Sequence, residues 1–268
     1  MHYQLVLADI DGTLLNDEKV LLPSTEQTIH DLVKSGVLFA TVSARTIPYT
    51  ESGISTLKDV CSANAYVNGA FVVTSKGEVL VDRFFDKEEA SYLVELCNEM
   101  RASFLCVSKD NALGKIIHPG FEMPFKQHHG TFSEVPMDAK SQLKVYLMPV
   151  ISEDIGSVVE IVTNKLPNIE AGPIRNLPGG PGVTFLQKKG TNKAKALRSI
   201  AEYYDVDLSK TLAFGDDVLN DRPMIEEAGC GVAMKNANKA LVDRAKYVTK
   251  KDNNEDGVGD FLRSMMWR

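Results

Sequence analysis

Two carboxylates stand where a buried strand is expected to end. Asp9 and Asp11 follow directly on the apolar run "YQLVLA", within the stretch "DIDGTLLN" at residues 9–16. Desolvating a carboxylate costs free energy, and two neighbouring carboxylates repel each other. The arrangement becomes favourable when a cation lies between them. Carboxylates without a nearby His or Cys suit a hard, oxygen-preferring ion, most simply Mg²⁺.

Such a metal site is suited to phosphoryl transfer. A carboxylate that attacks a phosphate dianion meets like-charge repulsion, which a metal ion in contact with both groups relieves. We expect Asp9 to be the nucleophile and to form an aspartyl-phosphate. Asp11 can face the same crevice, protonate the leaving oxygen and later activate water. Further donors to the phosphoryl oxygens are expected from Thr13, Ser43 and Lys193.

The elements that must position these residues alternate at both ends of the chain. The opening predicts a strand at 3–8, a helix at 23–36 and a strand at 37–43, followed by antiparallel hairpins within 65–82. The last third returns to the alternating pattern. Its predicted elements are helices at 191–204, 221–228, 237–244 and near 257–265, with strands at 211–214 and 230–234.

The middle of the chain has a different character. Its predicted elements are helices at 86–100 and 152–165, and strands at 103–108, 113–118 and 142–149. The Gly- and Pro-rich stretch 172–182 is interpreted as a linker. We therefore predict a three-layer, Rossmann-like α/β core from residues 1–83 and 184–268. An α+β module at 84–183 is inserted between its halves.

Polar residues follow four of the predicted core strands. They are Asp9 with Asp11, Ser43, Asn68, and the cluster "GDDVLND" at 215–221. In open parallel α/β sheets, ligands bind at the carboxyl ends of the strands. The acidic groups are about 200 residues apart in sequence, yet this rule lets them converge on one crevice.

Four sequence motifs carry a resemblance to a known family. The stretch D-x-D-G-T-L after an apolar strand resembles the first motif of the haloacid dehalogenase-like (HAD) superfamily. The stretches "TVSAR", "KKGTNKAKAL" and "GDDVLNDRPMIEEAGCGVAM" resemble its second, third and fourth motifs. With "NGA" at 68–70 and "DGV" at 256–258, the chain is most similar to the Cof-like phosphatases. Their large cap, of the IIB type, is inserted between motifs two and three, as is the segment 84–183.

The resemblance implies roles at matching positions. It implies that Asp9 is the nucleophile and a Mg²⁺ ligand. Asp11 would be the general acid and base, and its backbone carbonyl a second ligand. Ser43 and Lys193 would bind the phosphate, and Asn220 would contribute a substrate-side amide. The second motif has Ser-Ala-Arg where Thr-Gly-Arg is commoner, a change that keeps the hydroxyl.

The third metal-bearing carboxylate is ambiguous. The fourth motif has one residue more between "GD" and "ND" than is usual in the subfamily, so the ligand could be Asp216 or Asp217. We favour Asp216, because the strand end fixes its position, whereas an extra residue is easily absorbed in a loop.

Composition limits the classes of partner. The chain has 268 residues, of which 44% are hydrophobic and 25% charged, as in ordinary globular proteins. Its net charge of −6 argues against nucleic acid or an anionic membrane as the main partner. We find no signal-peptide pattern and no apolar stretch long enough to span a bilayer. A reducing, cytoplasmic location is expected because the four cysteines, Cys61, Cys97, Cys106 and Cys230, form no CxxC pair.

The sequence thus predicts a Mg²⁺-dependent phosphatase of small phosphorylated metabolites, either sugar phosphates or phosphorylated cofactors. A phosphomutase of the same superfamily is an alternative. A phosphate-accepting binding protein is another, although Asp11 and the large insertion argue against it. The histidines of the inserted module, His118, His128 and His129, are expected to be surface residues.

Overall fold

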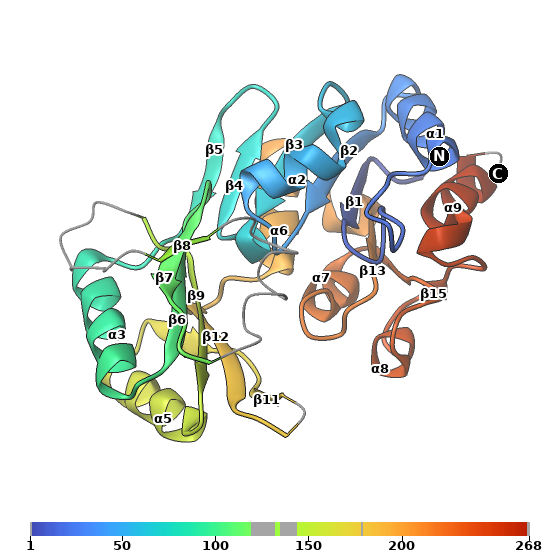
Figure 1. The fold of residues 1–268 in the computed structure, drawn as a ribbon. Coiled ribbons are helices and arrows are strands. Elements are labelled where there is room, and N and C mark those ends of the chain that lie inside the picture. Colours follow the sequence, from blue (N-terminus) through green and yellow to red (C-terminus); the bar gives the residue numbers. More distant parts are fainter. Residues whose placement is uncertain (1, 119–131, 135–143, 178, 267–268) are drawn as a thin grey trace. The chain divides into compact units, whose positions relative to one another are not determined.

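A computed structural model describes residues 2–118, 132–134, 144–177 and 179–266 (Figure 1). The chain divides into two compact units, which we describe separately. The first comprises Met1–Ala44, Thr50–Asp82 and Asn192–Arg268, and the second Arg45–Tyr49 and Arg83–Thr191. The second unit thus reaches beyond the inserted module expected at 84–183, because the strand at Gly182–Lys188 pairs within its sheet.

The first unit is built on an eight-stranded sheet of order β15-β14-β13-β1-β2-β3-β4-β5. The strands from β15 to β3 run parallel, and β4 and β5 add two antiparallel strands at one edge. Their bounds are β1 Leu5–Asp9, β2 Leu38–Val42, β3 Cys61–Tyr66, β4 Phe71–Thr74, β5 Val79–Asp82, β13 Thr211–Gly215, β14 Cys230–Ala233 and β15 Tyr247–Val248.

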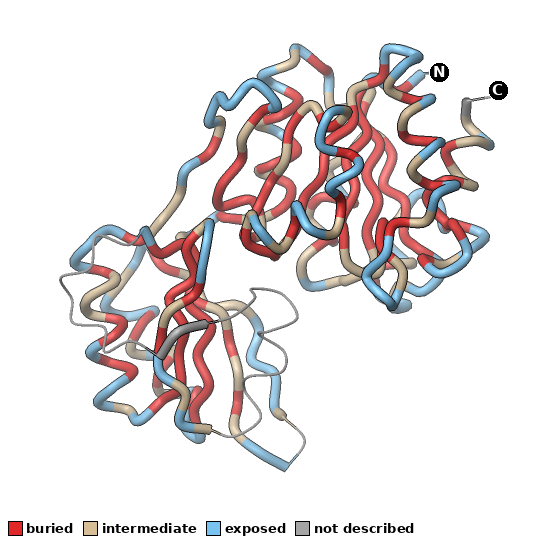
Figure 2. Tube along the Cα trace, turned by 45° about the horizontal axis from the view of Figure 1, so that its top comes forward, coloured by how far each residue is buried: buried red, intermediate tan, exposed pale blue. Residues whose placement is uncertain are grey.

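Helices of this unit cover both faces of the sheet. On β1, Val6 and Ala8 belong to one core cluster, and Leu5 and Leu7 belong to the other. The strand is therefore buried on both faces, which explains its unbroken apolar run and confirms the three-layer α/β class (Figure 2). The helices are α1 Pro23–Lys34, α6 Lys193–Tyr203, α7 Arg222–Glu227, α8 Lys239–Val242 and α9 Gly257–Met266. Helix α2, Ile47–Gly53, begins in residues of the second unit and ends in residues of the first.

Local sequence signals fix where these helices begin and end. Pro23 occupies the first turn of α1, where its missing N–H is no loss. Gly36 follows the same helix with φ of +91°, a conformation that glycine adopts freely. The Asn192 side chain accepts a hydrogen bond from the Lys195 N–H at 2.9 Å and so caps α6. That cap makes Lys193 the first residue of the helix.

The second unit contains a sheet of order β10-β12-β9-β6-β7-β8, with β11 paired to β12. Helices α3 and α5 pack against it through one apolar cluster (Figure 1). The bounds are α3 Lys87–Glu99, α5 Ile155–Lys165, β6 Ser103–Val107, β7 Ala112–Lys115, β8 Phe132–Glu134, β9 Leu147–Ser152, β10 Ile169–Ala171, β11 Arg175–Asn176 and β12 Gly182–Lys188.

One strand of this sheet differs from the sequence prediction. We expected a strand at 142–149, but β9 runs from Leu147 through Pro149 to Ser152. Pairing with both β6 and β12 holds the segment beyond the proline in the sheet. No helix among the described residues combines the length and apolar character needed to cross a bilayer.

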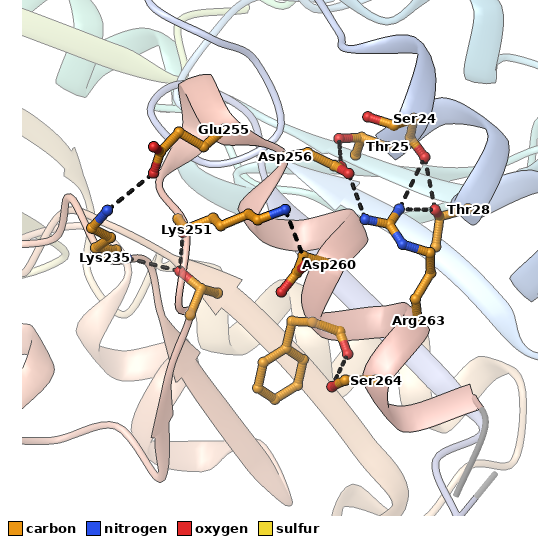
Figure 3. A network of polar contacts seen from close by, with 12 residues as sticks. Ser24, Thr25, Thr28, Lys235, Lys251, Glu255, Asp256, Asp260, Arg263 and Ser264 are labelled. Atoms are coloured by element: carbon orange, nitrogen blue, oxygen red, sulfur yellow. Dashed lines mark hydrogen bonds and ion pairs between the residues drawn. The ribbon is translucent and has the colours of Figure 1, made fainter.

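A buried polar network joins the first helix to the last (Figure 3). Asp256 accepts hydrogen bonds from Thr25 Oγ1 and Arg263 Nη2, both at 2.6 Å. Arg263 Nη1 also donates to Thr28 Oγ1 at 2.7 Å. Because Asp256 is buried, its charge-assisted bonds should fix α9 against α1.

We predict that Asp256→Asn lowers the free energy of unfolding by about 2 kcal/mol, because a bond to a charged group contributes more than a neutral one. Asn tolerates the left-handed conformation of Asp256, at φ of +69°, so backbone strain would not explain the loss of stability. Asp260→Asn is the matched control, since its ion pair with Lys251 is more exposed. The free energy of unfolding of both variants is measured by denaturant unfolding. Equal losses in Asp256→Asn and Asp260→Asn would contradict a stabilising role of the network.

Candidate active site

A buried charge cluster lies at the carboxyl end of the first unit's sheet. Asp9 ends β1, Asp216 and Asp221 follow β13, and Lys193 begins α6. One carboxylate oxygen from each of the three aspartates lies within 4.8 Å of the others. The structure thus brings together the predicted residues Asp9, Lys193 and Asp216. It adds Asp221, which sequence reasoning did not single out.

Lys193 connects the members of this cluster. Its Nζ donates to Asp9 Oδ1 and to Asp221 Oδ1, each at 2.5 Å, and its side chain is 4% exposed. Burial alone would lower the pKa of Lys193, but Asp221 and Asp9 together outweigh it and hold the pKa above its ordinary value. Lys193 is therefore a permanent buried cation.

Asp221 organises the loop after β13. While Oδ1 bonds to Lys193, Oδ2 accepts from the backbone N–H groups of Asp216 at 2.8 Å and Asp217 at 2.9 Å. Gly215 makes this approach possible, since a Cβ there would lie 2.6–2.7 Å from the Asp221 side chain. The signal in the sequence was the "ND" pair of the fourth motif, which we interpreted only for Asn220.

Asp216 is directed into the cluster by the loop after β1. Thr13 Oγ1 donates to Asp216 Oδ1 at 3.0 Å, so the hydroxyl predicted to bind phosphate contacts this carboxylate. Gly12, with φ of +74°, lies so near that a Cβ would come within 2.4 Å of Asp216 Oδ2. Burial, and next the charge of Asp221, raise the pKa of Asp216 to about 6, although the Thr13 bond opposes this.

Asp217, the alternative ligand, takes part in its own loop. It accepts hydrogen bonds from the Leu219 N–H at 3.2 Å and from Asn220 Nδ2 at 2.6 Å. The Asn220 amide, predicted to face substrate, thus donates to Asp217 in this structure. The carboxylate that joins Asp9 and Asp221 is that of Asp216.

Ser43 and Asp11, two further predicted site residues, belong to the first unit. Ser43 follows β2 and is buried, with its N–H bonded to the Ala65 carbonyl and its own carbonyl bonded to the Asn68 N–H. The Asp11 carboxylate pairs with Lys19 at 2.7 Å. In the second unit, His118 Nδ1 shares a hydrogen bond with Ser103 Oγ. His128 and His129 lie outside the described residues.

The cluster has more negative than positive charge, which suits it to bind a cation. Burial raises the pKa of Asp9 well above its ordinary value; Lys193 opposes the shift, while Asp221 and Asp216 add to it. Among the described residues, no hydrogen-bond donor reaches Oδ2 of Asp9 or Oδ2 of Asp216. Two carboxylate oxygens beside a third acid form the donor set that a hard divalent ion prefers.

Comparisons with known proteins agree with this geometry. A sequence model of the haloacid dehalogenase-like hydrolases matches residues 6–262. The 5-amino-6-(5-phospho-D-ribitylamino)uracil phosphatase YitU of Bacillus subtilis is 28% identical, with 97% of this chain and 96% of that protein aligned. A second 5-amino-6-(5-phospho-D-ribitylamino)uracil phosphatase, YbjI of Escherichia coli, is 25% identical, with 99% of this chain and 97% of that protein aligned. The solved structure of the HAD subclass IIB sugar phosphatase BT4131 matches with a TM-score of 0.79 at 23% identity, covering 98% of this chain and 99% of that one.

We predict that Asp216→Asn raises the free energy of unfolding of the metal-free protein above about pH 6, by roughly 1–2 kcal/mol. Between the ordinary pKa of 3.8 and the raised value of about 6, the folded state holds a proton that the unfolded state has lost. The contribution of Asp216 to stability therefore falls as pH rises through this window.

The measurement is denaturant unfolding in EDTA across this pH range, with Asp217→Asn as the matched control. The gain from Asp216→Asn should vanish near the ordinary pKa of 3.8, while Asp217→Asn, which loses local hydrogen bonds, should show no gain in stability. A loss of stability in Asp216→Asn above pH 6 would contradict the buried repulsion.

Proposed function

This chain belongs to the haloacid dehalogenase-like hydrolases, and we propose that it hydrolyses small phosphorylated metabolites through an aspartyl-phosphate on Asp9, with Mg²⁺ as cofactor. Hydrolysis of phosphate esters is the activity of its family and of its phosphatase relatives. The observation that carries the finer proposal is the environment of Asp9. Lys193 donates to its Oδ1, and the Asp9 carboxylate shares the acidic cluster with Asp216 and Asp221.

The first chemical step transfers the phosphoryl group to Asp9. A carboxylate oxygen of Asp9 attacks phosphorus as the bond from phosphorus to the leaving oxygen breaks. Asp11 in its protonated form gives its proton to that leaving oxygen. Lys193 keeps the Asp9 carboxylate oriented and balances part of the charge around it.

The second step restores the enzyme. Asp11, now a carboxylate, takes a proton from water as the water oxygen attacks phosphorus. The bond between phosphorus and the Asp9 oxygen then breaks, which releases inorganic phosphate. Ser43, at the neighbouring strand end, and the Thr13 backbone N–H would donate to the phosphoryl oxygens in both steps.

The acidic cluster would hold the metal. The Asp9 and Asp216 carboxylates have the uncommitted oxygens, and the family resemblance adds the Asp11 backbone carbonyl. When bound, Mg²⁺ would offset the charge repulsion between Asp9 and the phosphoryl group. We favour Asp216 over Asp217, because Asp216 belongs to the cluster with Asp9 and Asp221, whereas Asp217 does not.

We assign the choice of substrate to the second unit. It is inserted between the second and third motifs, as in the type IIB caps that the sequence resembles. YitU and the E. coli relative are named for a phosphorylated ribityl group attached to a uracil ring, and BT4131 for sugar phosphates. These names support a phosphate ester of a sugar, of a sugar alcohol or of a cofactor as the substrate class.

Asp9→Asn tests the proposed nucleophile. An amide neither attacks phosphorus nor ligates Mg²⁺ comparably, so phosphate release from p-nitrophenyl phosphate should fall by more than about 10³-fold. Asp31→Asn, an exposed carboxylate on α1, is the control for a contaminating phosphatase and should match wild type. Undiminished turnover in a folded Asp9→Asn protein would refute the mechanism.

Asp11→Asn tests the proposed acid separately. The backbone carbonyl is kept, but proton transfer is lost, and this typically contributes 10²–10⁴-fold, a range of roughly two orders of magnitude. The loss of kcat/KM, which reports the steps up to departure of the leaving group, should be large for an alkyl phosphate and smaller for p-nitrophenyl phosphate, whose leaving group needs little protonation. Equal losses on the two esters would count against Asp11 as the general acid.

A further inference from the structure

A turn at residues 16–20 places an ammonium group on the Asp11 carboxylate. Lys19 Nζ donates to Asp11 Oδ1 at 2.7 Å. The Lys19 side chain is 46% exposed and that of Asp11 is 21% exposed. The contact is therefore partly exposed, and it involves the residue proposed to move protons to and from the substrate.

The backbone of this turn is closed by three hydrogen bonds. The Asn16 N–H donates to the Val20 carbonyl at 3.0 Å, and the Lys19 N–H donates to the Asn16 carbonyl at 2.9 Å. Asn16 Oδ1 accepts from the Val20 N–H at 2.9 Å. Lys19 itself has φ of +63°, a left-handed conformation that disfavours residues with a side chain. The turn holds Lys19 in this conformation nonetheless.

The turn is also tied to the segment that precedes α9. The Asp17 carboxylate accepts from Asn253 Nδ2 and Asn254 Nδ2, both at 3.1 Å, and the Asp17 N–H donates to Asn254 Oδ1 at 3.0 Å. Asn253, which is buried, also donates to the Leu15 carbonyl at 3.0 Å. Hydrogen bonds therefore hold the turn from both sides, so the position of the Lys19 Cα is fixed.

Fold stability does not account for the ion pair. Exposed ion pairs contribute little to stability, and a strained backbone is retained where the surroundings impose it, often beside an active site. Asp11 is two residues from Asp9, whose cluster has more negative than positive charge, and like charges repel. An anchored ammonium group opposes that repulsion and limits where the carboxylate can lie.

We propose that Lys19 is a positioning residue, which holds the Asp11 carboxylate in place for proton transfer to the leaving oxygen. The inference rests on the proposed role of Asp11 and deepens it. Lys19 acts through Asp11 and needs no contact with the substrate. Removal of the Lys19 side chain should therefore slow the first step with esters whose leaving oxygen needs a proton from Asp11. The same step with esters whose leaving oxygen needs little protonation should be spared.

The test is a double-mutant cycle between Lys19→Met and Asp11→Asn, with kcat and KM measured on glycerol 3-phosphate and p-nitrophenyl phosphate. Lys19→Met should lower kcat/KM on the alkyl ester by about tenfold and on the aryl ester by about twofold or less, because only the first step depends on protonation of the leaving oxygen. In the Asp11→Asn background, Lys19→Met should change kcat/KM by less than about twofold.

Two further variants serve as controls. One tests whether another cation at position 19 suffices, and the other tests whether loss of a surface lysine elsewhere has the same effect. Lys19→Arg should restore at least about half of wild-type kcat/KM, because it supplies a cation from the same backbone. Lys235→Met is the matched control and should leave both activities unchanged. Its ion pair with Glu255 spans 3.0 Å, and the lysine is 51% exposed.

The outcomes distinguish the two levels of the proposal. An undiminished loss from Lys19→Met in the Asp11→Asn background, or an equal loss of kcat/KM on the two esters, would overturn the positioning role and indicate direct substrate contact. Wild-type kcat/KM on the alkyl ester in Lys19→Met would also overturn it. Equal losses of Asp11→Asn on the two esters would instead refute Asp11 as the acid, and this proposal with it.

Discussion

The buried ammonium group of Lys193 is the interaction on which the site depends. It joins the end of β1, the start of α6 and the loop after β13, three segments that are distant in sequence. Without that cation, the aspartates of the cluster would face one another across a poorly solvated space. Asp221 can accept from Lys193 and from two loop N–H groups at once, and this directs Asp216 towards Asp9.

The same cluster is costly to the fold and useful to the chemistry. One buried cation does not neutralise Asp9, Asp216 and Asp221. Burial first, and then the neighbouring aspartate charges, raise the pKa values of Asp9 and Asp216. Apolar side chains of helices pack on both faces of the sheet, and their burial offsets this unfavourable free energy. A site of this kind is stabilised when a divalent cation offsets its excess negative charge.

Much of this arrangement could be predicted from patterns in the sequence. Buried parallel strands have apolar runs, and their carboxyl ends meet at one edge, so Asp9 and Asp216 could be placed together in advance. Lys193, which begins a helix, was added through its proposed phosphate contact and the family resemblance. Asp221 could not be identified, because its contribution depends on backbone N–H groups whose direction is fixed only by the folded loop. Asn220 was assigned to the substrate, but its amide bonds to Asp217, a local contact that residue type does not reveal. Lys19 had no signal, since a left-handed lysine is imposed by the turn around it.

The central claim is that Asp9 carries the phosphoryl group, and covalent trapping tests it most directly. The variant to use is Asp11→Asn with p-nitrophenyl phosphate, because it keeps the first step but lacks the base for the second. After an acid quench and borohydride reduction, mass spectrometry should find homoserine at position 9, in step with a burst of p-nitrophenol. A burst of p-nitrophenol with residue 9 unmodified would contradict the account.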